Sequence, residues 1–311
     1  MTNEDDETDV DVFDDTNERE TLEIDSDWVA LPTANLLSVE EADEFLRWRP
    51  ANLVAIVGER NGGKTTLVSE IYERYLRGPF AGQDFCHSRT LIGFEQKTYQ
   101  SRAGTNASLP DTPRTSGNDG LRFFHLGLRS RDTGDRRDIL ISERAGEKYR
   151  DARDQPAQAL AFDEIRKAHI AVFILDGQRV ADDLQREEAF ASVRGIVRGF
   201  FDAGAISSTC EAQLVTTKFD LLSGASQAEA RNALDEFQRR FVTTFEKKFA
   251  RVTTWQTSAR DPKGTVEAAW GLAPLLMSWL DPRALGEIAQ TQLPPLTDEF
   301  DRLLLRRGQT A

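Results

Sequence analysis

The sequence predicts an α/β fold, in which a doubly wound, mostly parallel sheet carries helices on both faces. Apolar runs of strand length alternate along the chain with longer segments whose apolar residues recur at helical spacing. The run at 169–175 is apolar without alternation, which is typical of a strand buried on both faces of a sheet. A glycine-rich segment at 58–66 separates a strand pattern from a helix pattern, as in α/β folds that bind phosphate.

The expected elements follow from this periodicity and from the residues that begin and end each one. A helix at 38–49 begins with Ser38 and Glu41 at capping-box spacing and ends before Pro50. Strands are expected at 53–57, 121–128, 138–142, 169–175, 212–216 and 252–257, with the second and third forming a hairpin. Further helices are expected at 64–76, 182–201, 226–249 and 264–280.

Residues 58–66 read GERNGGKTT and match the phosphate-loop pattern G-x4-G-K-[ST]. A helix that opens at Lys64 after such a loop directs backbone N–H groups into one concavity, which suits a polyphosphate. Lys64 is expected to reach the β and γ phosphates, and the Thr65 hydroxyl to bind Mg²⁺. The sequence therefore predicts a P-loop NTPase fold. The expected phosphate-binding residues are Gly58, Asn61, Gly62, Gly63, Lys64, Thr65 and Thr66.

The negative charge of the chain is concentrated near its beginning. The net charge is −13 over 311 residues, and nearly all of it comes from residues 1–27, where thirteen acidic residues accompany the single Arg19. This composition predicts a disordered acidic tail at 1–30. The remaining regions are expected to be a helical lead-in at 31–50, a P-loop domain at 51–281 and an extension at 282–311.

Composition also limits the compartment and the partners. The two cysteines, Cys86 and Cys210, cannot make a disulfide framework, and no apolar stretch has the length of a membrane span. We therefore expect a cytoplasmic protein without membrane association. Because the chain outside the tail has no excess of basic residues, direct nucleic-acid binding is disfavoured.

Two short motifs farther along the chain indicate the base. The expected strand at 212–216 leads into Thr217-Lys218-Phe219-Asp220, a variant of the guanine-specifying NKxD motif. A carboxylate at this position can accept hydrogen bonds from guanine N1–H and the N2 amine, and adenine offers neither donor. The next strand leads into Ser258-Ala259, where backbone N–H groups can meet guanine O6. Carboxyl ends of parallel strands share one edge, so a site for GTP or GDP is predicted there. Its expected base-binding residues are Thr217, Lys218, Asp220, Ser258 and Ala259.

With these motifs, residues 51–281 resemble the translation-factor-related (TRAFAC) class of GTPases. The strings FAGQDFCHSRTLIGFE, DTPRT at 111–115 and SERAGEKYRDARD at 142–154 are similar to the bacterial double-GTPase families. The resemblance implies Mg²⁺-dependent hydrolysis of GTP to GDP and phosphate. It also implies a role in multi-gene conflict, or antiviral, systems, where such proteins are usually encoded beside a second GTPase-like protein.

The chain departs from the class pattern at switch II, the segment that contacts the γ-phosphate. Where Asp-x-x-Gly is usual, the chain has Glu143-Arg144-Ala145-Gly146, and Glu143 is one methylene longer than Asp. Glu143 is expected to hold the Mg²⁺ shell through a water, or else to reach past it. Glu147 stands where many such enzymes place a water-orienting Gln. The expected catalytic residues are thus Lys64, Gly146 and Glu147.

The long polar segment at 78–118 is expected to be an enlarged switch I, because an ordinary connection is much shorter. A threonine of this segment is expected to bind Mg²⁺ in the GTP state. Thr90 is the first choice, followed by Thr98 and Thr112.

Hydrolysis by the isolated chain is expected to be slow, because Glu147 repels the γ-phosphate and has no amide N–H. The transition state needs additional positive charge. Arg60, Arg89 and Arg144 are internal candidates for it. A protein partner is the other source, so we expect a second GTPase, an effector or an activating protein to bind.

Two other functions remain open from the sequence. Asp176 ends the run Phe173-Ile174-Leu175 in the manner of a Walker B strand, as in an adenine-dependent ATPase or small-molecule kinase. The second of these functions is a scaffold that has lost nucleotide binding. The three histidines, at 87, 125 and 169, are scattered and form no Cys/His cluster, so the sequence predicts no zinc site.

Overall fold

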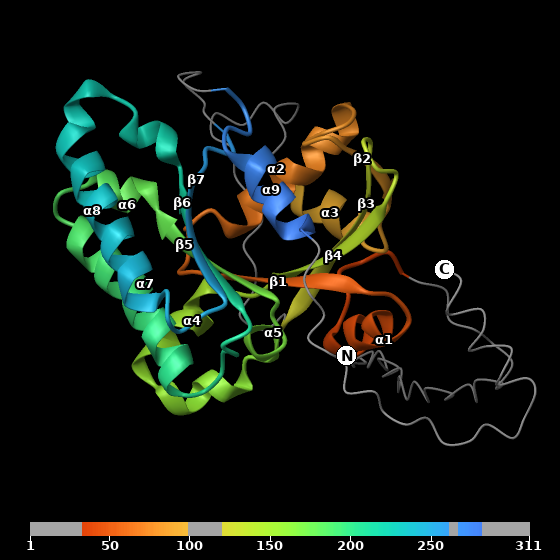
Figure 1. Cartoon of the computed structure of the whole chain (residues 1–311), viewed down its shortest axis with the longest axis horizontal. Helices are drawn as coiled ribbons and strands as arrows, with labels where there is room; N and C mark the ends of the chain where they lie inside the picture. Colours follow the sequence, from red (N-terminus) through yellow and green to blue (C-terminus); the bar gives the residue numbers. More distant parts are fainter. Residues whose placement is uncertain (1–32, 99–119, 261–266, 282–311) are drawn as a thin grey trace, which may run out of the picture. The chain divides into compact units, whose positions relative to one another are not determined.

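The computed structural model describes residues 33–98, 120–260 and 267–281, all within one compact unit. In these residues seven strands form a single sheet in the order β2-β3-β4-β1-β5-β6-β7 (Figure 1). The strands are β1 (Ala51–Val57), β2 (Gln83–His87), β3 (Arg122–Ser130), β4 (Arg136–Glu143), β5 (Ile170–Asp176), β6 (Glu211–Thr217) and β7 (Arg251–Gln256). The predicted α/β class and mostly parallel sheet are confirmed.

The pairing of the strands brings the carboxyl ends of five of them to one edge. β1 pairs in parallel with β4 on one side and with β5 on the other, so that Val54 lies opposite both Ile141 and Ile170. β6 and β7 continue the parallel order beyond β5. The predicted hairpin is present as β3 and β4, and β2 extends it by antiparallel pairing with β3.

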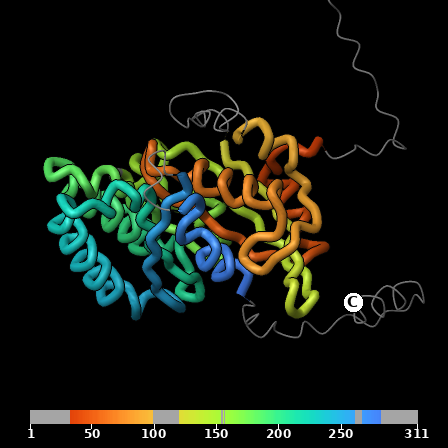
Figure 2. Tube along the Cα trace, turned by 90° about the horizontal axis from the view of Figure 1, so that it is seen from above, coloured from red at the N-terminus to blue at the C-terminus, as the bar shows by residue number. Residues whose placement is uncertain are grey.

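Helices cover both faces of the sheet (Figures 1 and 2). One face packs against α2 (Lys64–Arg77), α3 (Leu91–Thr98) and α9 (Leu272–Leu280). The other packs against α1 (Val39–Trp48), α4 (Gly146–Asp154), α5 (Asp163–Arg166), α7 (Arg186–Asp202) and α8 (Ala228–Phe245). The short helix α6 (Gly177–Ala181) follows β5, and short 3-10 helices occupy Pro156–Ala161, Phe219–Leu222 and Ala225–Gln227.

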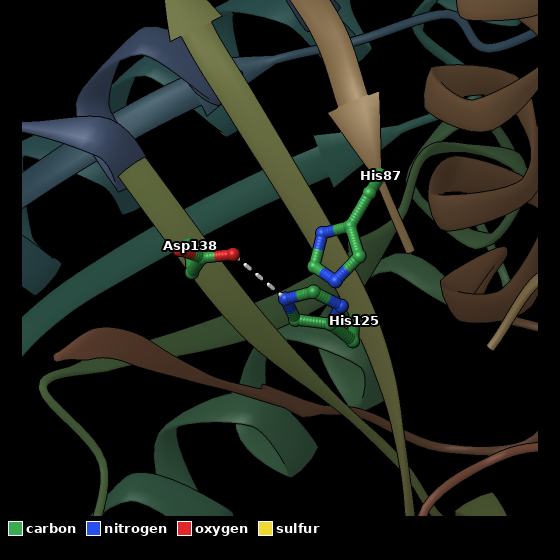
Figure 3. Close-up of side chains that lie close together, drawn as sticks. All are labelled: His87, His125 and Asp138. Atoms are coloured by element: carbon green, nitrogen blue, oxygen red, sulfur yellow. Dashed lines mark hydrogen bonds and ion pairs between the residues drawn. The ribbon is translucent and has the colours of Figure 1, made fainter. Parts of the chain in front are cut away.

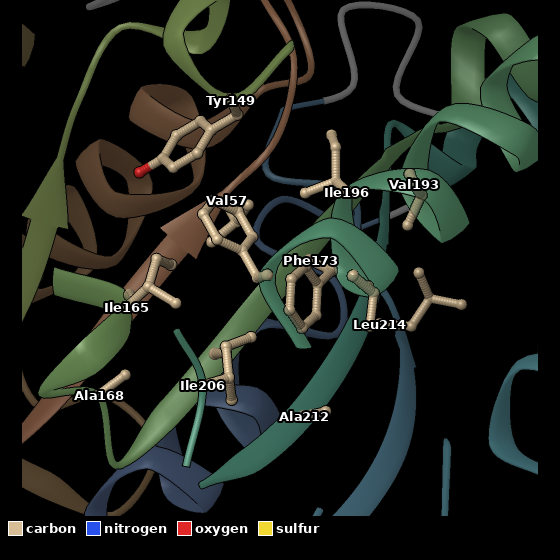
Figure 4. Close-up of a cluster of buried hydrophobic side chains, with 14 of the residues drawn as sticks. Val57, Tyr149, Ile165, Ala168, Phe173, Val193, Ile196, Ile206, Ala212 and Leu214 are labelled. Carbon is tan, nitrogen blue, oxygen red and sulfur yellow. The ribbon is translucent and has the colours of Figure 1, made fainter. Parts of the chain in front are cut away.

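The central strand β5 shows why its sequence is apolar throughout. Alternate residues, including Ala171 and Phe173, belong to the core beneath α4, α7 and α8, while Val172 and Ile174 belong to the core beneath α2 and α9. Figure 4 shows Phe173 between Val57 and Leu214 of the neighbouring strands, with side chains of α7 above it. Burial on both faces therefore replaces the alternating pattern of a half-exposed strand.

The predicted beginning of α1 is confirmed in detail. The Ser38 hydroxyl accepts from the backbone N–H of Glu41, and the Glu41 carboxylate accepts from the backbone N–H of Ser38 at 2.7 Å. This reciprocal capping box satisfies two donors at the helix start.

Some elements differ from the expectation. The segment 78–118 contains β2 and α3, which were not predicted, and α4 was missed because its sequence is almost entirely polar. The expected helix at 264–280 begins at Leu272 in the described chain, and the expected helix at 182–201 begins at Arg186. The acidic tail and the extension at 282–311 lie outside the described residues. Among the described helices, none has the length and apolarity needed to cross a membrane.

Candidate functional site

The phosphate loop lies between the end of β1 and the start of α2. Its turn places Asn61 at φ 62° and Gly63 at φ 88°, in the left-handed region, and α2 opens at Lys64. The buried Lys64 ammonium donates to the carbonyls of Gly58 at 2.9 Å and Glu59 at 3.0 Å. Burial lowers the pKa of Lys64, and the nearby carboxylates of Glu143 and Glu147 partly oppose this shift. The lysine amine is thus held inside the loop.

A hydroxyl and a carboxylate meet beside this loop. The Thr65 hydroxyl donates to Glu143 Oε1 at 3.0 Å, and the Glu143 side chain is almost fully buried at the end of β4. The contact follows from the β1–β4 pairing, which is fixed near the site by the Ile56 N–H donating to Ser142 Oγ at 2.9 Å. Hydroxyl and carboxylate oxygens are the ligands that Mg²⁺ prefers. Thr65 and Glu143 therefore suit the metal position that the sequence predicts.

The start of α4 contacts the phosphate loop directly. At Gly146, an added Cβ would lie 2.5 Å from the backbone nitrogen of Arg60, so only glycine permits this approach. The next residue, Glu147, has its Oε1 3.9 Å from the Arg60 Nε, and both side chains are substantially exposed. The expected switch II residues are therefore beside the loop.

The base motif is tied to the same loop by side chains. The Lys218 ammonium donates to the Asn61 carbonyl at 2.9 Å, to Asp176 at 3.0 Å and to Gln178 Oε1 at 3.2 Å. The Thr217 hydroxyl donates to the Gly62 carbonyl at 2.7 Å. Lys218 itself has φ 52°, a left-handed conformation that a non-glycine residue rarely adopts.

The two base motifs meet each other. Ser258 Oγ donates to Asp220 Oδ1 at 2.7 Å, and the Phe219 N–H donates to the Thr257 carbonyl at 3.1 Å. The loop that carries Ser258 and Ala259 is fixed to α2 by Arg260, whose Nε donates to buried Glu70 at 3.0 Å. The structure therefore brings the predicted phosphate and base residues, together with Thr65 and Glu143 of the predicted metal site, to one edge of the sheet.

The comparison with protein families identifies this arrangement. The model of the Double-GTPase 2 family matches residues 52–280, which is most of the chain. The chain belongs to the Double-GTPase 2 family. The predicted resemblance to the bacterial double-GTPase families is thereby confirmed. A search of the curated proteins finds no match.

Two solved structures show a distant likeness to the Double-GTPase 2 chain. The translation elongation factor SelB from Methanococcus maripaludis, in its apo form, is 15% identical, with a TM-score of 0.32 over 74% of this chain. The chain spans about a third (33%) of that elongation factor. The conserved domain of the dynein light intermediate chain is 13% identical, with a TM-score of 0.35. The match covers 83% of this chain and 86% of that chain.

Thr90 does not occupy the expected position in the Double-GTPase 2 domain. Its buried hydroxyl accepts from the His125 backbone N–H at 2.9 Å. His125 pairs with Leu140, which pairs in turn with Leu53, four residues before the end of β1. The end of β1 lies about 13 Å beyond Leu53, at about 3.3 Å per residue. Thr90 is therefore not beside the phosphate loop in this structure, and its binding of Mg²⁺ in the GTP state stays a prediction. Thr98 is buried at the end of α3, and Thr112 lies outside the described residues.

Two of the three candidate arginines are also held elsewhere. Arg144 forms a two-pronged ion pair with fully buried Glu164, at 2.6 and 2.9 Å, and its guanidinium lies 4.7 Å from the Phe162 ring. Arg89 lies over Phe45, beneath β3. Arg144 is not a solvated surface charge, whereas Arg89 is exposed, and neither is placed at the phosphate loop. Arg60 remains beside it.

The sequence predicts that the three histidines lie apart, but two of them come together in the structure. His87 and His125 come together with Asp138 across β2, β3 and β4 (Figure 3). The His125 Nδ1 accepts from the Arg89 N–H at 3.0 Å, so the ring proton is on Nε2, which lies 3.0 Å from Asp138. A metal at Nε2 would require the ring proton on Nδ1, where it would face the Arg89 N–H, which is itself a donor. The sequence does not predict that His87, His125 and Asp138 come together, because their contact depends on the register of β2.

A guanidinium also fills the space that a metal would need. Arg136 Nη2 lies 2.8 Å from both Asp138 and the His87 Nδ1. Burial and the neighbouring positive groups lower the pKa of His87. The cluster is therefore a charge-balanced polar network that joins β2 to the sheet, and its donors do not fit a zinc ion.

We predict that Asp138→Asn destabilises the fold by about 1–3 kcal/mol at neutral pH, since it removes a buried charge-assisted network. Burial raises the pKa of Asp138, but the hydrogen bonds from His125 and Arg136 outweigh it and lower the pKa to about 2. A lowered carboxylate pKa stabilises the fold above its unfolded value, near 3.8, and this contribution is lost as the pH falls toward 2.

Urea unfolding at several pH values tests this prediction, with Asp135→Asn as the matched control at an exposed site on the same hairpin. The difference between Asp138→Asn and wild type should be constant from pH 7 to 5 and shrink below about pH 4. Equal stability of the two proteins at pH 7 would contradict a role for the network.

Proposed function

We propose that this protein is a guanine-nucleotide-binding switch that hydrolyses GTP to GDP and phosphate with Mg²⁺. The observation that carries the proposal is the 3.0 Å contact between Thr65 and Glu143. It joins the helix-opening hydroxyl of the phosphate loop to the carboxylate at the end of the adjacent strand, and these are oxygen donors suited to Mg²⁺. Membership of the Double-GTPase 2 family supports the same reading.

Guanine specificity is assigned to Asp220. Its Oδ1 is oriented by the Ser258 hydroxyl, which leaves the other carboxylate oxygen and the remaining lone pairs of Oδ1 for guanine N1–H and N2. Lys218 lies against the phosphate loop, so its stem can flank the purine while its ammonium fixes the loop. A site built to pair both donors of guanine rejects adenine, because the carboxylate would then lose its partners.

The chain supplies the groups around the reacting phosphate. In this proposal Lys64, held inside the loop, would stabilise negative charge on the β and γ phosphates, and Glu147, beside Arg60, would orient the attacking water. The Gly146 backbone approaches the loop. The bound Mg²⁺ would neutralise charge on the β and γ oxygens. Glu147 adds a negative charge at the water position, which opposes the reaction.

We propose that hydrolysis is slow until a partner protein assists. Arg144 and Arg89 are held away from the phosphate loop, and Arg60 faces Glu147. An arginine supplied by a partner accelerates phosphoryl transfer by roughly 10³–10⁵ in related enzymes. The partner would be a second GTPase, an effector or an activating protein, and the family resemblance favours a bacterial conflict or antiviral system.

The adenine-dependent alternative has less support. Asp176, its Walker B candidate, is paired with Lys218 at 3.0 Å and caps α6 by accepting from the Gln178 N–H at 3.0 Å. Glu143, rather than Asp176, contacts Thr65. An ATPase or kinase, and a scaffold without nucleotide, remain as outcomes of the experiment below.

The first test is competition of GTP and ATP against a fluorescent guanine nucleotide. We expect GTP to displace the probe and ATP to fail even at about 100-fold higher concentration, because adenine leaves Asp220 unpaired. Asp220→Ala should weaken GTP binding by about tenfold or more, while the exposed Asp235→Ala on α8 should bind as wild type. Equal displacement by ATP would support the ATPase or kinase, and no probe binding at micromolar protein would support the scaffold.

The second test is single-turnover GTP hydrolysis by the purified protein and by Glu147→Gln. We expect a wild-type rate far below one per second and a rate about tenfold higher for the Gln variant, which removes the repulsion and adds an amide donor. Glu187→Gln, an exposed change on α7, is the control. A wild-type rate near one per second would contradict dependence on a partner, and a slower Gln variant would show that Glu147 is already the working base.

A further inference from the structure

Glu59, the second residue of the phosphate loop, has no role in the function proposed above. Its side chain is only 11% exposed, although it belongs to a loop that must hold anionic phosphates. A carboxylate in such a place is unfavourable unless other groups neutralise it. No sequence signal marks Glu59, because this position of the loop pattern accepts any residue.

The Glu59 carboxylate is bound by side chains from three helices. Arg179 of α6 donates to Oε2 at 2.6 Å, and Ser192 of α7 donates to Oε1 at 2.7 Å. From α4, the Arg150 Nε lies 3.3 Å and the Arg153 Nη1 3.5 Å from Oε1. One carboxylate of the phosphate loop therefore gathers three guanidinium groups.

Glu59 is charged in this setting. Burial raises the pKa of its carboxyl group, but the hydrogen bonds from Ser192 and Arg150 and the neighbouring arginine charges outweigh that effect and lower the pKa. At neutral pH the ion pairs are therefore complete, and partial burial strengthens them relative to pairs in bulk water.

The partners differ in what they connect. Arg179 and Ser192 belong to helices that follow β5, whereas Arg150 and Arg153 belong to α4, which begins at Gly146 in switch II. α4 therefore contacts the phosphate loop twice. Its first residue packs on the backbone of Arg60, and its second turn is bound to Glu59.

We propose that Glu59 is a positioning residue that transmits the state of the nucleotide from the phosphate loop to helix α4. The inference rests on the proposed function, since it requires that GTP and GDP bind at this loop. A γ-phosphate adds negative charge and hydrogen-bond acceptors where Gly146 meets the loop. Because Glu59 fixes the second turn of α4 to the same loop, a shift at Gly146 is carried along the helix as one rigid element.

The test is hydrogen–deuterium exchange of peptides covering α4 in the full-length protein, with GDP or with a non-hydrolysable GTP analogue, for wild type and Glu59→Gln. For wild type we expect the α4 amides to exchange about tenfold or more slowly with the GTP analogue than with GDP. In Glu59→Gln this ratio should fall below about twofold when each nucleotide is present at a saturating concentration.

Two further variants keep the test sharp. Glu188→Gln removes another carboxylate that contacts Arg179, at 3.2 Å, but it lies outside the phosphate loop and should keep the wild-type ratio. Arg150→Gln changes a half-exposed partner on α4 itself and should reduce the ratio even if Glu59→Gln does not fold.

The outcomes separate the inference from the proposed function. If the contact of Glu59 with α4 is only structural, Glu59→Gln would speed exchange of α4 in both nucleotide states. The ratio of exchange between the GDP and GTP-analogue states would then stay as in wild type, and that result would overturn the inference. A wild type that binds both nucleotides with equal α4 exchange would overturn it as well. A wild type that binds neither nucleotide would overturn the proposed function itself.

Discussion

The parallel pairing of β1 with β4 on one side and β5 on the other is the constraint on which the candidate site depends. It places the end of β4 beside the phosphate loop, so that Glu143 reaches the Thr65 hydroxyl at 3.0 Å. The same order carries the base motif after β6 and the Ser258 loop after β7 to one edge. A register shift of one residue in β4 would turn Glu143 to the opposite face of the sheet. The β1–β4 bond between Ile56 and Ser142 opposes such a shift.

Charge balance is the second organising feature. The loop that must hold phosphates is surrounded by the carboxylates of Glu59, Glu143 and Glu147, and its own cation, Lys64, is buried among them. Each carboxylate has a counter-charge or donor in the structure: arginines at Glu59, Thr65 at Glu143, and Arg60 at Glu147. A nucleotide therefore enters a site whose positive groups are already engaged, and this accounts for the proposal of a slow intrinsic reaction that outside charge accelerates.

The sequence was sufficient where local patterns determine structure. The phosphate loop, the central strands and the capping box at Ser38 are set by short-range spacing, and the structure has them where the pattern predicts. It was insufficient where partners are distant in sequence. Arg144 binds Glu164, Thr90 binds His125, and His87 meets Asp138, and each contact depends on how strands and loops pack. Helix α4 was missed because its core contact rests on few residues, such as Tyr149, in an otherwise polar segment.

The central claim is that Thr65 and Glu143 form an Mg²⁺ site that holds a guanine nucleotide. The most direct measurement is the release rate of a fluorescent GDP analogue before and after chelation of Mg²⁺, for wild type and Glu143→Gln. The account predicts release at least about tenfold faster from wild type after chelation, and release from Glu143→Gln that is fast with or without Mg²⁺. A wild-type release rate that chelation leaves unchanged would contradict it.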